Sequence, residues 1–534
     1  MNFLITIILA LFFSFFPLLK VDFKSKKFLK DNKYYLLAFF ILFIGSFVRL
    51  FLIGKYPVGF NQDEASIGYE TYSLITNGID RNGMSYPVNF ISWGSGQNAL
   101  YAYLSYPFIK IFGLSVLSTR LPMALIGCLT LLVIYIFVNK AFNKKEALIF
   151  LFIFTILPWH ILKSRWALEA NLFPDFIIYS LVLIYFGLKN KKKKYFIFSS
   201  IIFGLSTYSY GTSYLFVPVF LIILYLFLIK TKKITLKEAL LYFSITGLVS
   251  LPMILYVIIN FLELDSIKIF NITIPKLYEN RMQNDTLLNG NIIGTLLDNI
   301  MKLLTITLLQ QDATLYNSIK YFGLYYYFSL PILGYGFYTC FKEKKNIYFK
   351  IMSIFLIASI LTALFIPPNI NRANIIWIPI SFYLCYGTIM LFKNIKKLYK
   401  ITLFLYATSF ILFNIYYFTQ YKYDLKQYSY YGLGEAIQYS DKIGYKNLYI
   451  TSSINQPYIF YLFFNRTDTN YYIKNKINTY NDDDREVVIS IKNVYFYVPT
   501  IPSSGDVIIV NDYDGIEYPT CEKKQIYNMK VFKC

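Results

Sequence analysis

Residues 34–69 read YYLLAFFILFIGSFVRLFLIGKYPVGFNQDEASIGY, an apolar run that ends in a polar stretch containing Asp63 and Glu64. The apolar part, residues 34–54, has the roughly 17–25 residues that an α-helix needs to cross a bilayer. Carboxylates at a membrane boundary have few structural uses and indicate a functional site. This stretch predicts a membrane helix followed by a loop that carries chemistry.

The rest of the chain has the same apolar character. It has 534 residues, of which 56% are hydrophobic and 20% aromatic, and its mean hydropathy is +0.46. Such a composition predicts a polytopic membrane protein, because a soluble protein does not carry this much apolar surface. The net charge of +22 does not predict nucleic-acid binding, since the lysines cluster in short loops between apolar runs.

Apolar runs of spanning length predict an all-α membrane domain with about twelve transmembrane helices. The runs are residues 1–19, 34–54, 116–138, 146–162, 172–188, 195–211, 213–229, 239–261, 325–341, 350–366, 373–392 and 401–419. The first run is expected to be an anchor, because it lacks the charged start and the cleavage site of a signal peptide. Residues 291–310 fit an interfacial helix better than a span.

Lysine-rich connections predict how the chain crosses the cell membrane. They are residues 20–33, 140–145, 189–194, 230–237, 342–350 and 393–400, and they alternate with connections poor in lysine and arginine. Because lysine-rich loops stay in the cytoplasm, the other connections are expected on the extracytoplasmic side. These are residues 55–115, 163–171, 210–213, 262–324 and 367–372 and the tail from 420.

The tail has the pattern of a small α/β domain. Helices are predicted at 433–443 and 456–464, and strands at 446–452, 486–490, 494–498 and 507–510. We therefore expect a membrane domain over 1–419, with outer loops 55–115 and 262–324, and an extracytoplasmic domain over 420–534. Cys521 and Cys534 in this domain can form a disulfide or remain free thiols.

Candidate functional residues fall in the predicted outer segments or at the ends of the spans next to them. Asp63 and Glu64 are candidate catalytic carboxylates, and the expected substrate-binding or lipid-phosphate-binding residues are His160, Lys163, Arg165, Glu169, Arg281 and Arg372. Most of the scarce arginines lie on the predicted outer side, and their guanidinium groups match phosphate. A carboxylate with several cations suits a phosphate-linked substrate and a proton to remove.

Structural alternatives exist for the same residues. Asp63 and Glu64 can begin a helix that Asn61 or Asp63 caps, Arg165 can snorkel to the interface, and His160 can be a hydrogen-bonded interface residue. The sequence has no His/Cys cluster of zinc-site type and no nucleotide-binding loop. No cofactor is expected to be required, and a divalent metal is not indicated.

A series of motifs carries a family resemblance. The motifs include Phe60-Asn61-Gln62-Asp63-Glu64-Ala65, Gly78-Ile79-Asp80, Thr119-Arg120-Leu121-Pro122, Pro158-Trp159-His160 and Ser164-Arg165. In order and spacing the sequence resembles the polyprenyl- and dolichyl-phosphate sugar transferases over residues 34–230, and more loosely to about 420. That group contains protein O-mannosyltransferases and the lipid A aminoarabinose transferase, and it has the GT-C membrane fold.

The resemblance implies an inverting glycosyltransferase. It would move a sugar from a polyprenyl-phosphate donor to an acceptor hydroxyl on a cell-envelope glycan, a glycolipid or a protein at the outer face of the membrane. The catalytic base of the family maps to Asp63, with Glu64 as its neighbour, and Arg165 is the best positional match for a cation that holds the lipid phosphate. Expected partners are the bilayer, the lipid-linked sugar and the acceptor.

Two other functions remain open from the sequence. A transporter or flippase of lipid-linked sugars would use the outer cations only to bind a headgroup. Transporters tend to have ionisable sites near the bilayer midplane and internal repeats. A binding or sensing protein would instead act through residues 420–534.

Overall fold

The computed structural model describes residues 3–22, 27–278, 287, 291–343, 346–426, 429–480 and 486–534. Within this structure the chain forms two compact units. Unit 1 comprises Met1–Ile53, Met123–Ile254 and Met282–Tyr417, and unit 2 comprises Gly54–Pro122, Leu255–Arg281 and Phe418–Cys534. The grouping of the loop after residue 54 with the C-terminal residues is not evident from the sequence.

Unit 1 is helical. Its helices are α1 (Phe3–Ser14), α2 (Phe28–Leu50), α6 (Lys144–Ile156), α7 (Pro158–Lys163), α8 (Glu169–Asn190), α9 (Lys193–Ser206), α10 (Ser213–Lys230), α11 (Leu236–Val249), α14 (Ile292–Leu309), α15 (Leu330–Lys342), α16 (Ile347–Phe365), α17 (Trp377–Asn394) and α18 (Leu398–Thr419). Two further helices, α5 (Val116–Ala141) and α12 (Leu251–Phe261), cross the boundary between the units, and the last two residues of α18, Phe418 and Thr419, belong to unit 2.

Eight helices among the described residues are long and apolar enough to cross a membrane, or up to nine if the bent pair α11–α12 is one span. This agrees with the predicted multi-pass membrane protein. The count of twelve is not confirmed, because four predicted spans are helices of only 12 to 14 residues: α1, α6, α9 and α15. By length and composition α14 belongs to the eight, although its sequence favoured an interfacial position.

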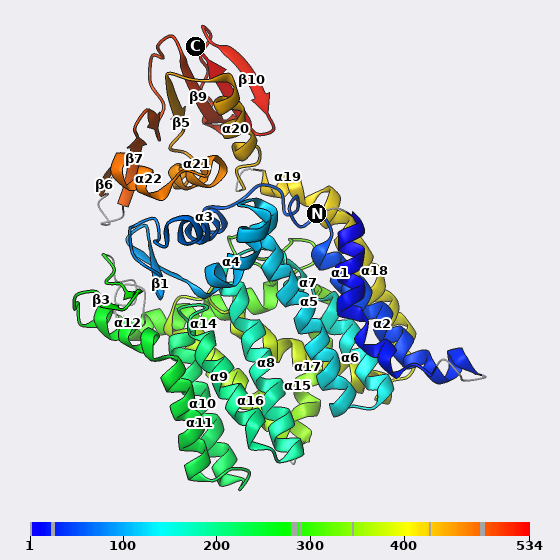
Figure 1. Ribbon diagram of the computed structural model, residues 1–534. Coiled ribbons are helices and arrows are strands. Elements are labelled where there is room, and N and C mark those ends of the chain that lie inside the picture. The colour runs from blue at the N-terminus through cyan, green and yellow to red at the C-terminus, as the bar shows by residue number, and fades with distance from the viewer. Residues whose placement is uncertain are drawn as a thin grey trace. The chain divides into compact units, whose positions relative to one another are not determined.

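Glycine permits the closest helix packing in unit 1. A Cβ atom on Gly336 of α15 would lie 2.0 Å from the Tyr383 carbonyl oxygen of α17, and one on Gly387 would lie 2.4 Å from the Ile332 carbonyl oxygen. Small residues at a crossing let two membrane helices approach backbone to backbone. The close contact of α15 and α17 can be followed in Figure 1, and the apolar span that contains α17 is 94% buried.

Unit 2 begins with a short helical layer and ends with a sheet. Its first segment contains α3 (Gln62–Asn77), the hairpin β1 (Asn89–Ser92) and β2 (Ser95–Asn98), and α4 (Leu100–Phe112); a second hairpin is β3 (Ile267–Ile269) and β4 (Ile272–Ile274). The C-terminal helices are α19 (Tyr421–Leu425), α20 (Leu433–Ile443), α21 (Pro457–Asn465) and α22 (Thr469–Asn475).

A seven-stranded mixed sheet completes unit 2, in the order β10-β11-β9-β5-β8-β7-β6. The strands are β5 (Asn447–Ile450), β6 (Lys476–Tyr480), β7 (Glu486–Ile491), β8 (Val494–Tyr495), β9 (Asp506–Asn511), β10 (Glu522–Ile526) and β11 (Met529–Lys533). Strand β5 is parallel to both of its neighbours, β8 and β9, and the other four strand pairs of this sheet are antiparallel. The predicted C-terminal α/β domain is confirmed, and β6, β10 and β11 are additions to the predicted strands.

The first segment of unit 2 and the C-terminal domain share one hydrophobic core. Phe60 and Tyr69 belong to the same buried cluster as Phe460, Phe463 and the inner residues of the sheet. Hydrogen bonds reinforce the contact: the Tyr69 hydroxyl donates to the Thr467 carbonyl at 2.9 Å, and the Thr469 hydroxyl donates to Ser73 Oγ at 2.7 Å. The packing of α3 therefore depends on residues almost 400 positions later in the chain.

Cys521 and Cys534 form a disulfide that joins the start of the β10–β11 hairpin to its end. This answers the question that the sequence left open. Cys128, Cys340 and Cys385 are buried free thiols.

Candidate active site

The acidic pair begins helix α3 of unit 2. Asn61 is the N-cap, and its side chain accepts a hydrogen bond of 2.9 Å from the Glu64 backbone N–H. The capping role considered for Asn61 is therefore confirmed, and both carboxylates lie in the first helical turn. The helix dipole stabilises negative charge at this end.

Glu64 is a buried structural carboxylate. Arg120 binds it with two hydrogen bonds of 2.7 Å, from Nε to Oε1 and from Nη2 to Oε2. The same guanidinium donates to the carbonyls of Pro57 at 2.7 Å and Gly59 at 2.9 Å. Arg120 thus fixes the approach segment, residues 57–60, to the first turn of α3.

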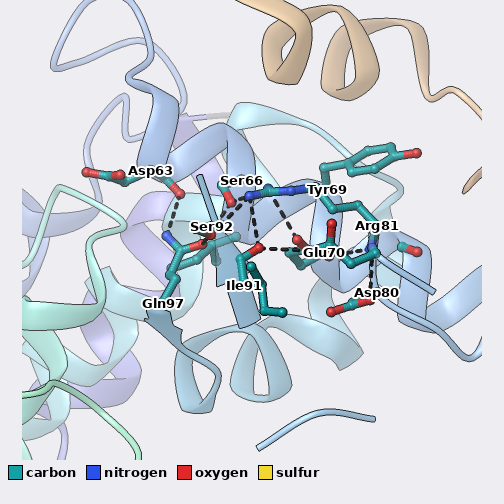
Figure 2. Close-up of polar contacts among 12 residues, drawn as sticks. Asp63, Ser66, Tyr69, Glu70, Asp80, Arg81, Ile91, Ser92 and Gln97 are labelled. Carbon is teal, nitrogen blue, oxygen red and sulfur yellow. Dashed lines mark hydrogen bonds and ion pairs between the residues drawn. The ribbon is translucent and has the colours of Figure 1, made fainter. Parts of the chain in front are cut away.

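Asp63 has a different environment. Its side chain is half-buried, whereas that of Glu64 is fully buried. The contact of Asp63 with Gln97 is made by its backbone carbonyl, which accepts from Gln97 Nε2 at 3.4 Å. Figure 2 shows the Asp63 carboxylate extending away from Gln97 and Ser66.

A buried polar network holds Gln97 in place (Figure 2). Gln97 Oε1 accepts from the hydroxyls of Ser66 at 2.8 Å and Ser92 at 3.2 Å. Arg81 donates to the same two hydroxyl oxygens, at 2.6 and 3.0 Å. The backbone of α3 at Asp63 is therefore connected to the β1–β2 hairpin through satisfied polar groups.

Two carboxyl groups flank the buried Arg81. Glu70 Oε1 lies 3.2 Å from Arg81 Nη1, and Glu70 Oε2 accepts from the Arg81 backbone N–H at 2.9 Å. Burial raises the pKa of Glu70, although the charge of Arg81 opposes this shift. Burial likewise raises the pKa of Asp80 to about 6, against the lowering effect of backbone hydrogen bonds from Met84 and Asn82.

In unit 1 the structure brings His160 and Lys163 together in a buried cluster. Lys163 Nζ lies 2.5 Å from Asp175 Oδ2, and His160 Nε2 lies 3.5 Å from Asp175 Oδ1. Arg49 Nη2 lies 2.7 Å from His160 Nδ1. Because arginine can only donate, Nδ1 accepts and the ring proton belongs on Nε2, facing Asp175.

Arg165 caps the C-terminal end of α2. Its guanidinium donates to the carbonyls of Val48 at 2.5 Å, Arg49 at 3.0 Å and Phe51 at 2.7 Å. It also donates to the Tyr417 hydroxyl at 3.1 Å. Cations near the last carbonyls of a helix stabilise that end. These contacts give Arg165 a structural role, and its predicted role in phosphate binding stays a prediction.

The remaining predicted residues differ in exposure. Glu169 begins α8 and is 8% exposed. Arg372 is half-buried, and its Nη1 lies 3.4 Å from the Pro367 carbonyl oxygen. Arg281 lies outside the described residues. Within the described part of the chain, no group of three or more His, Cys, Asp and Glu side chains could hold a metal ion.

Arg49, Asp175 and Gln97 are polar residues of these networks that the sequence reasoning did not single out. Arg49 and Asp175 stand inside predicted spans, and an ionisable residue within a span is itself a signal of function or pairing. Gln97 gives no such signal, since a glutamine in a polar loop is common. Only the fold brings Gln97 to the backbone of Asp63.

Comparisons with known proteins agree with a sugar-transferase fold. The family model of dolichyl-phosphate-mannose-protein mannosyltransferases matches residues 98–260, a region that begins after α3 and includes α7 and α8. No curated protein matches the chain in sequence.

Two solved structures of ArnT from Cupriavidus metallidurans have the same fold. The apo state has a TM-score of 0.53 at 11% identity, covering 95% of this chain and 98% of that chain. The complex with undecaprenyl phosphate has a TM-score of 0.52 at 11% identity, covering 93% of this chain and 97% of that chain.

A third similarity is to the apo oligosaccharyltransferase of Archaeoglobus fulgidus, with a TM-score of 0.47 at 14% identity. The match covers 81% of this chain and 64% of the archaeal protein, so this chain spans less than two thirds of that protein's length.

Proposed function

We propose that this chain is a glycosyltransferase that uses a lipid-phosphate-linked sugar, and that Asp63 is the base of an inverting sugar transfer at the outer face of the cell membrane. The match of residues 98–260 to the mannosyltransferase family model and the fold shared with ArnT support this proposal. The donor is a polyprenyl-phosphate sugar. The acceptor is a hydroxyl group of a cell-envelope glycan, a glycolipid or a protein.

The proposed step is a single displacement. The Asp63 carboxylate takes the proton of the acceptor hydroxyl as the acceptor oxygen forms a bond to the anomeric carbon. The bond from that carbon to the phosphate oxygen breaks, and polyprenyl phosphate leaves with the bonding electrons. General-base assistance of this kind contributes roughly 10²–10⁴-fold to the rate.

The contrast between two adjacent carboxylates carries this proposal. Glu64 has both oxygens bound by Arg120 in a buried pair, so taking up a proton there would disrupt the pair. Asp63 is half-buried at the start of the same helix, and its backbone is held by Gln97. A positioned, accessible carboxylate is what proton transfer from an acceptor requires.

The cations of the donor site are a separate part of the proposal. Arg372, half-buried in unit 1, and Arg281 are proposed ligands of the lipid phosphate. His160, Lys163 and Arg165 take part in buried pairs and helix capping, so we assign them to the support of that site, and Glu169 to substrate contact. Cations that receive a departing phosphate stabilise the transition state electrostatically.

Two features support an extracytoplasmic location for unit 2. The Cys521–Cys534 disulfide is typical of an oxidising compartment. The lysine-rich connections are also all on the opposite side of the predicted spans from residue 63.

Asp63→Asn in the purified full-length protein tests the base. The assay offers a panel of polyprenyl-phosphate sugars as donors, and mass analysis of envelope glycans identifies the acceptors. The rate of sugar transfer should fall by about 10²–10⁴-fold. Thermal unfolding should be unchanged. The matched control is Asp441→Asn, at an exposed carboxylate of α20 in the same unit, which should keep full activity. Near-normal transfer by Asp63→Asn would remove Asp63 as the base.

A further inference from the structure

A polar cleft lies within unit 2, beside the approach segment to α3. Its volume is about 400 Å³, within the range of roughly 300–1,000 Å³ typical of small-molecule sites. One wall comes from residues 54–60 and the other from residues 430–438, with contributions from Lys422, Phe460, Phe464 and Tyr527. None of the residues discussed for the transfer chemistry lines it.

The lining has the chemistry of a carbohydrate site. Tyr56, Tyr430, Tyr431 and Tyr527 contribute aromatic rings. Tyr431 and Tyr527 stack at 4.2 Å, and Tyr527 remains 55% exposed. Such rings combine an apolar face with a polar tip and can cover the C–H face of a sugar. Glu435 and Gln438, both exposed, provide acceptors and donors for hydroxyl groups.

The cleft also favours a negative charge. Lys55 and Lys422 line it against the single carboxylate of Glu435. Neither lysine has an ion-pair partner among the residues that the structure describes. In addition α20 begins at the cleft with Gly432 as N-cap and no side-chain cap, so the positive end of this helix adds to the lysines.

The shape of the backbone at this point requires glycine. Gly432 has φ = 98°, and a Cβ atom there would lie 2.4 Å from the Ile526 carbonyl oxygen. Gly59, on the facing wall, has φ = 73°, and its Cβ would lie 2.0 Å from the Ser429 carbonyl oxygen. In both walls, therefore, the backbone conformation requires a glycine at one position, which distinguishes the walls from ordinary surface loops.

Arg120 connects the cleft to helix α3, which carries Asp63. Its guanidinium holds the carbonyls of Pro57 and Gly59, next to the lining, and both oxygens of Glu64 in the first turn of α3. A molecule in the cleft would thus contact a wall that is rigidly joined to the turn carrying Asp63. A cleft joined to this turn is well placed to bind the acceptor, because the acceptor is the substrate that Asp63 deprotonates.

We infer that this cleft binds an anionic saccharide, the charged glycan portion of the acceptor. The inference rests on the proposed sugar transfer, which would give such a ligand its role. The tyrosines take the sugar ring, Lys55 and Lys422 take its phosphate or carboxylate, and Glu435 and Gln438 bind its hydroxyl groups.

Binding to the full-length protein in nanodiscs, measured by calorimetry, tests the cleft. The probes are glucose 6-phosphate, glucose and inorganic phosphate. Glucose 6-phosphate should bind at least tenfold more tightly than either of the others. Lys55→Ala/Lys422→Ala should weaken it at least tenfold, and Tyr527→Ala several-fold. The matched control Lys442→Ala/Lys446→Ala, which removes two exposed lysines of the same unit, should leave it unchanged.

A measurement on the unaltered protein guards against misfolded variants. Glucose 6-phosphate should protect Lys55 and Lys422, but not Lys442, from acetylation detected by mass spectrometry. Equal binding by Lys55→Ala/Lys422→Ala, or inorganic phosphate binding as tightly as the sugar phosphate, would overturn the inference. So would displacement of the probe by undecaprenyl phosphate, because the probe would then occupy the donor site.

The two proposals fail separately. Asp63→Asn should bind glucose 6-phosphate as the unaltered protein does while losing transfer. If the unaltered protein transfers sugar but does not bind the probe, the cleft assignment is wrong and the base assignment stands. If Asp63→Asn transfers sugar normally but the cleft binds the probe as described, the base assignment is wrong and the cleft assignment stands.

Discussion

At the scale of single residues, neighbours in sequence can have unrelated tasks. Glu64 is fully buried and shares its charge with Arg120, whereas Asp63 is half-buried in the same helical turn. A buried pair of this kind is costly to break, because removing one partner leaves an uncompensated charge. Substitutions in the Glu64–Arg120 pair therefore probe the stability of the fold, whereas substitutions of Asp63 probe catalysis.

Arg120→Leu should destabilise unit 2 by about 3–5 kcal/mol, the usual cost of leaving a buried carboxylate without its partner. Thermal unfolding of the purified protein measures this loss. The double change Glu64→Gln/Arg120→Leu should recover part of it, since no charge then remains buried. If Arg120→Leu unfolds at the same temperature as the unaltered protein, Glu64 and Arg120 do not stabilise the fold.

Asp80 predicts a pH dependence of stability. Its pKa in the folded protein is raised by burial to about 6, from an ordinary value of 3.8. The folded state therefore binds this proton more tightly than the unfolded state. The contribution of Asp80 to stability is fully present below about pH 4 and is lost as the pH rises through about 6. At 1.36 kcal/mol per pKa unit, the loss for this buried group is about 3 kcal/mol.

Asp80→Asn keeps the side-chain oxygen that accepts from Asn82 and Met84 but removes the titrating group. Its unfolding temperature should change less between pH 5 and pH 7 than that of the unaltered protein. A pH dependence as steep as in the unaltered protein would mean that another group carries it.

The acidic pair could be found from the sequence, but the division of roles could not. The partner of Glu64 is Arg120, 56 residues away, and only the fold brings them together. The basic residues show the same limit. His160 stands at the end of the predicted span 146–162 and Lys163 at the start of the following turn, yet their partner Asp175 lies in the next apolar run. Spacing identifies charged residues, whereas pairing depends on tertiary structure.

At the scale of elements, helix α3 is held by close packing. A Cβ atom on Gly68 would lie 2.5 Å from Phe463 Cε2 of α21 and 2.9 Å from Thr119 Oγ1. The absence of a side chain at residue 68 therefore lets α21 approach α3. This contact joins the helix that carries Asp63 to the C-terminal domain.

Gly68→Leu should destabilise unit 2 by about 1–3 kcal/mol, the typical cost of overpacking a core. Transfer should fall as well, because α3 shifts relative to the network around Gln97. Gly334→Leu in α15 is the control, since a Cβ atom on Gly334 meets nothing within 4 Å. Thermal unfolding and transfer assays measure both variants, and equal effects in the two would contradict the role of the contact.

The pattern of apolar runs predicted the class of the elements better than their lengths. Runs such as residues 116–138 and 172–188 contain one long helix each, α5 and α8. The run at 239–261 instead contains α11 and α12, which meet at an angle of 66°. Hydropathy averages over such a bend, because it does not detect the backbone turn near Ser250 and Leu251.

At the scale of the whole molecule, the C-terminal residues are not an independent appendage. Sequence composition separates residues 420–534 from the rest, but their hydrophobic core includes Phe60, Ala65 and Tyr69 of the first segment. Composition cannot detect that the first segment and the C-terminal residues share one core, since each of them has its own periodic pattern of apolar residues. Removing the tail would expose the inner face of α3.

Truncation after residue 419 should therefore unfold the first segment as well as abolish transfer. Limited proteolysis should cut between residues 60 and 122 in the truncated protein and spare this region in the full-length protein. The milder control is Cys521→Ser/Cys534→Ser, which removes the disulfide and leaves the shared core in place. A truncated protein that still resists cleavage there would contradict the shared core.

The three-segment construction of unit 2 also has a consequence for the order of synthesis. Helix α3 is complete at residue 77, but the first of its C-terminal core partners, Leu433, is made 356 residues later (433 − 77). At a translation rate of roughly 5–20 residues per second, this interval lasts roughly 20–70 s. During that time the apolar face of α3 has no lasting partner from the tail, so the nascent chain needs protection from aggregation, and a ribosome that stalls late leaves a protein whose earliest helix is unfinished.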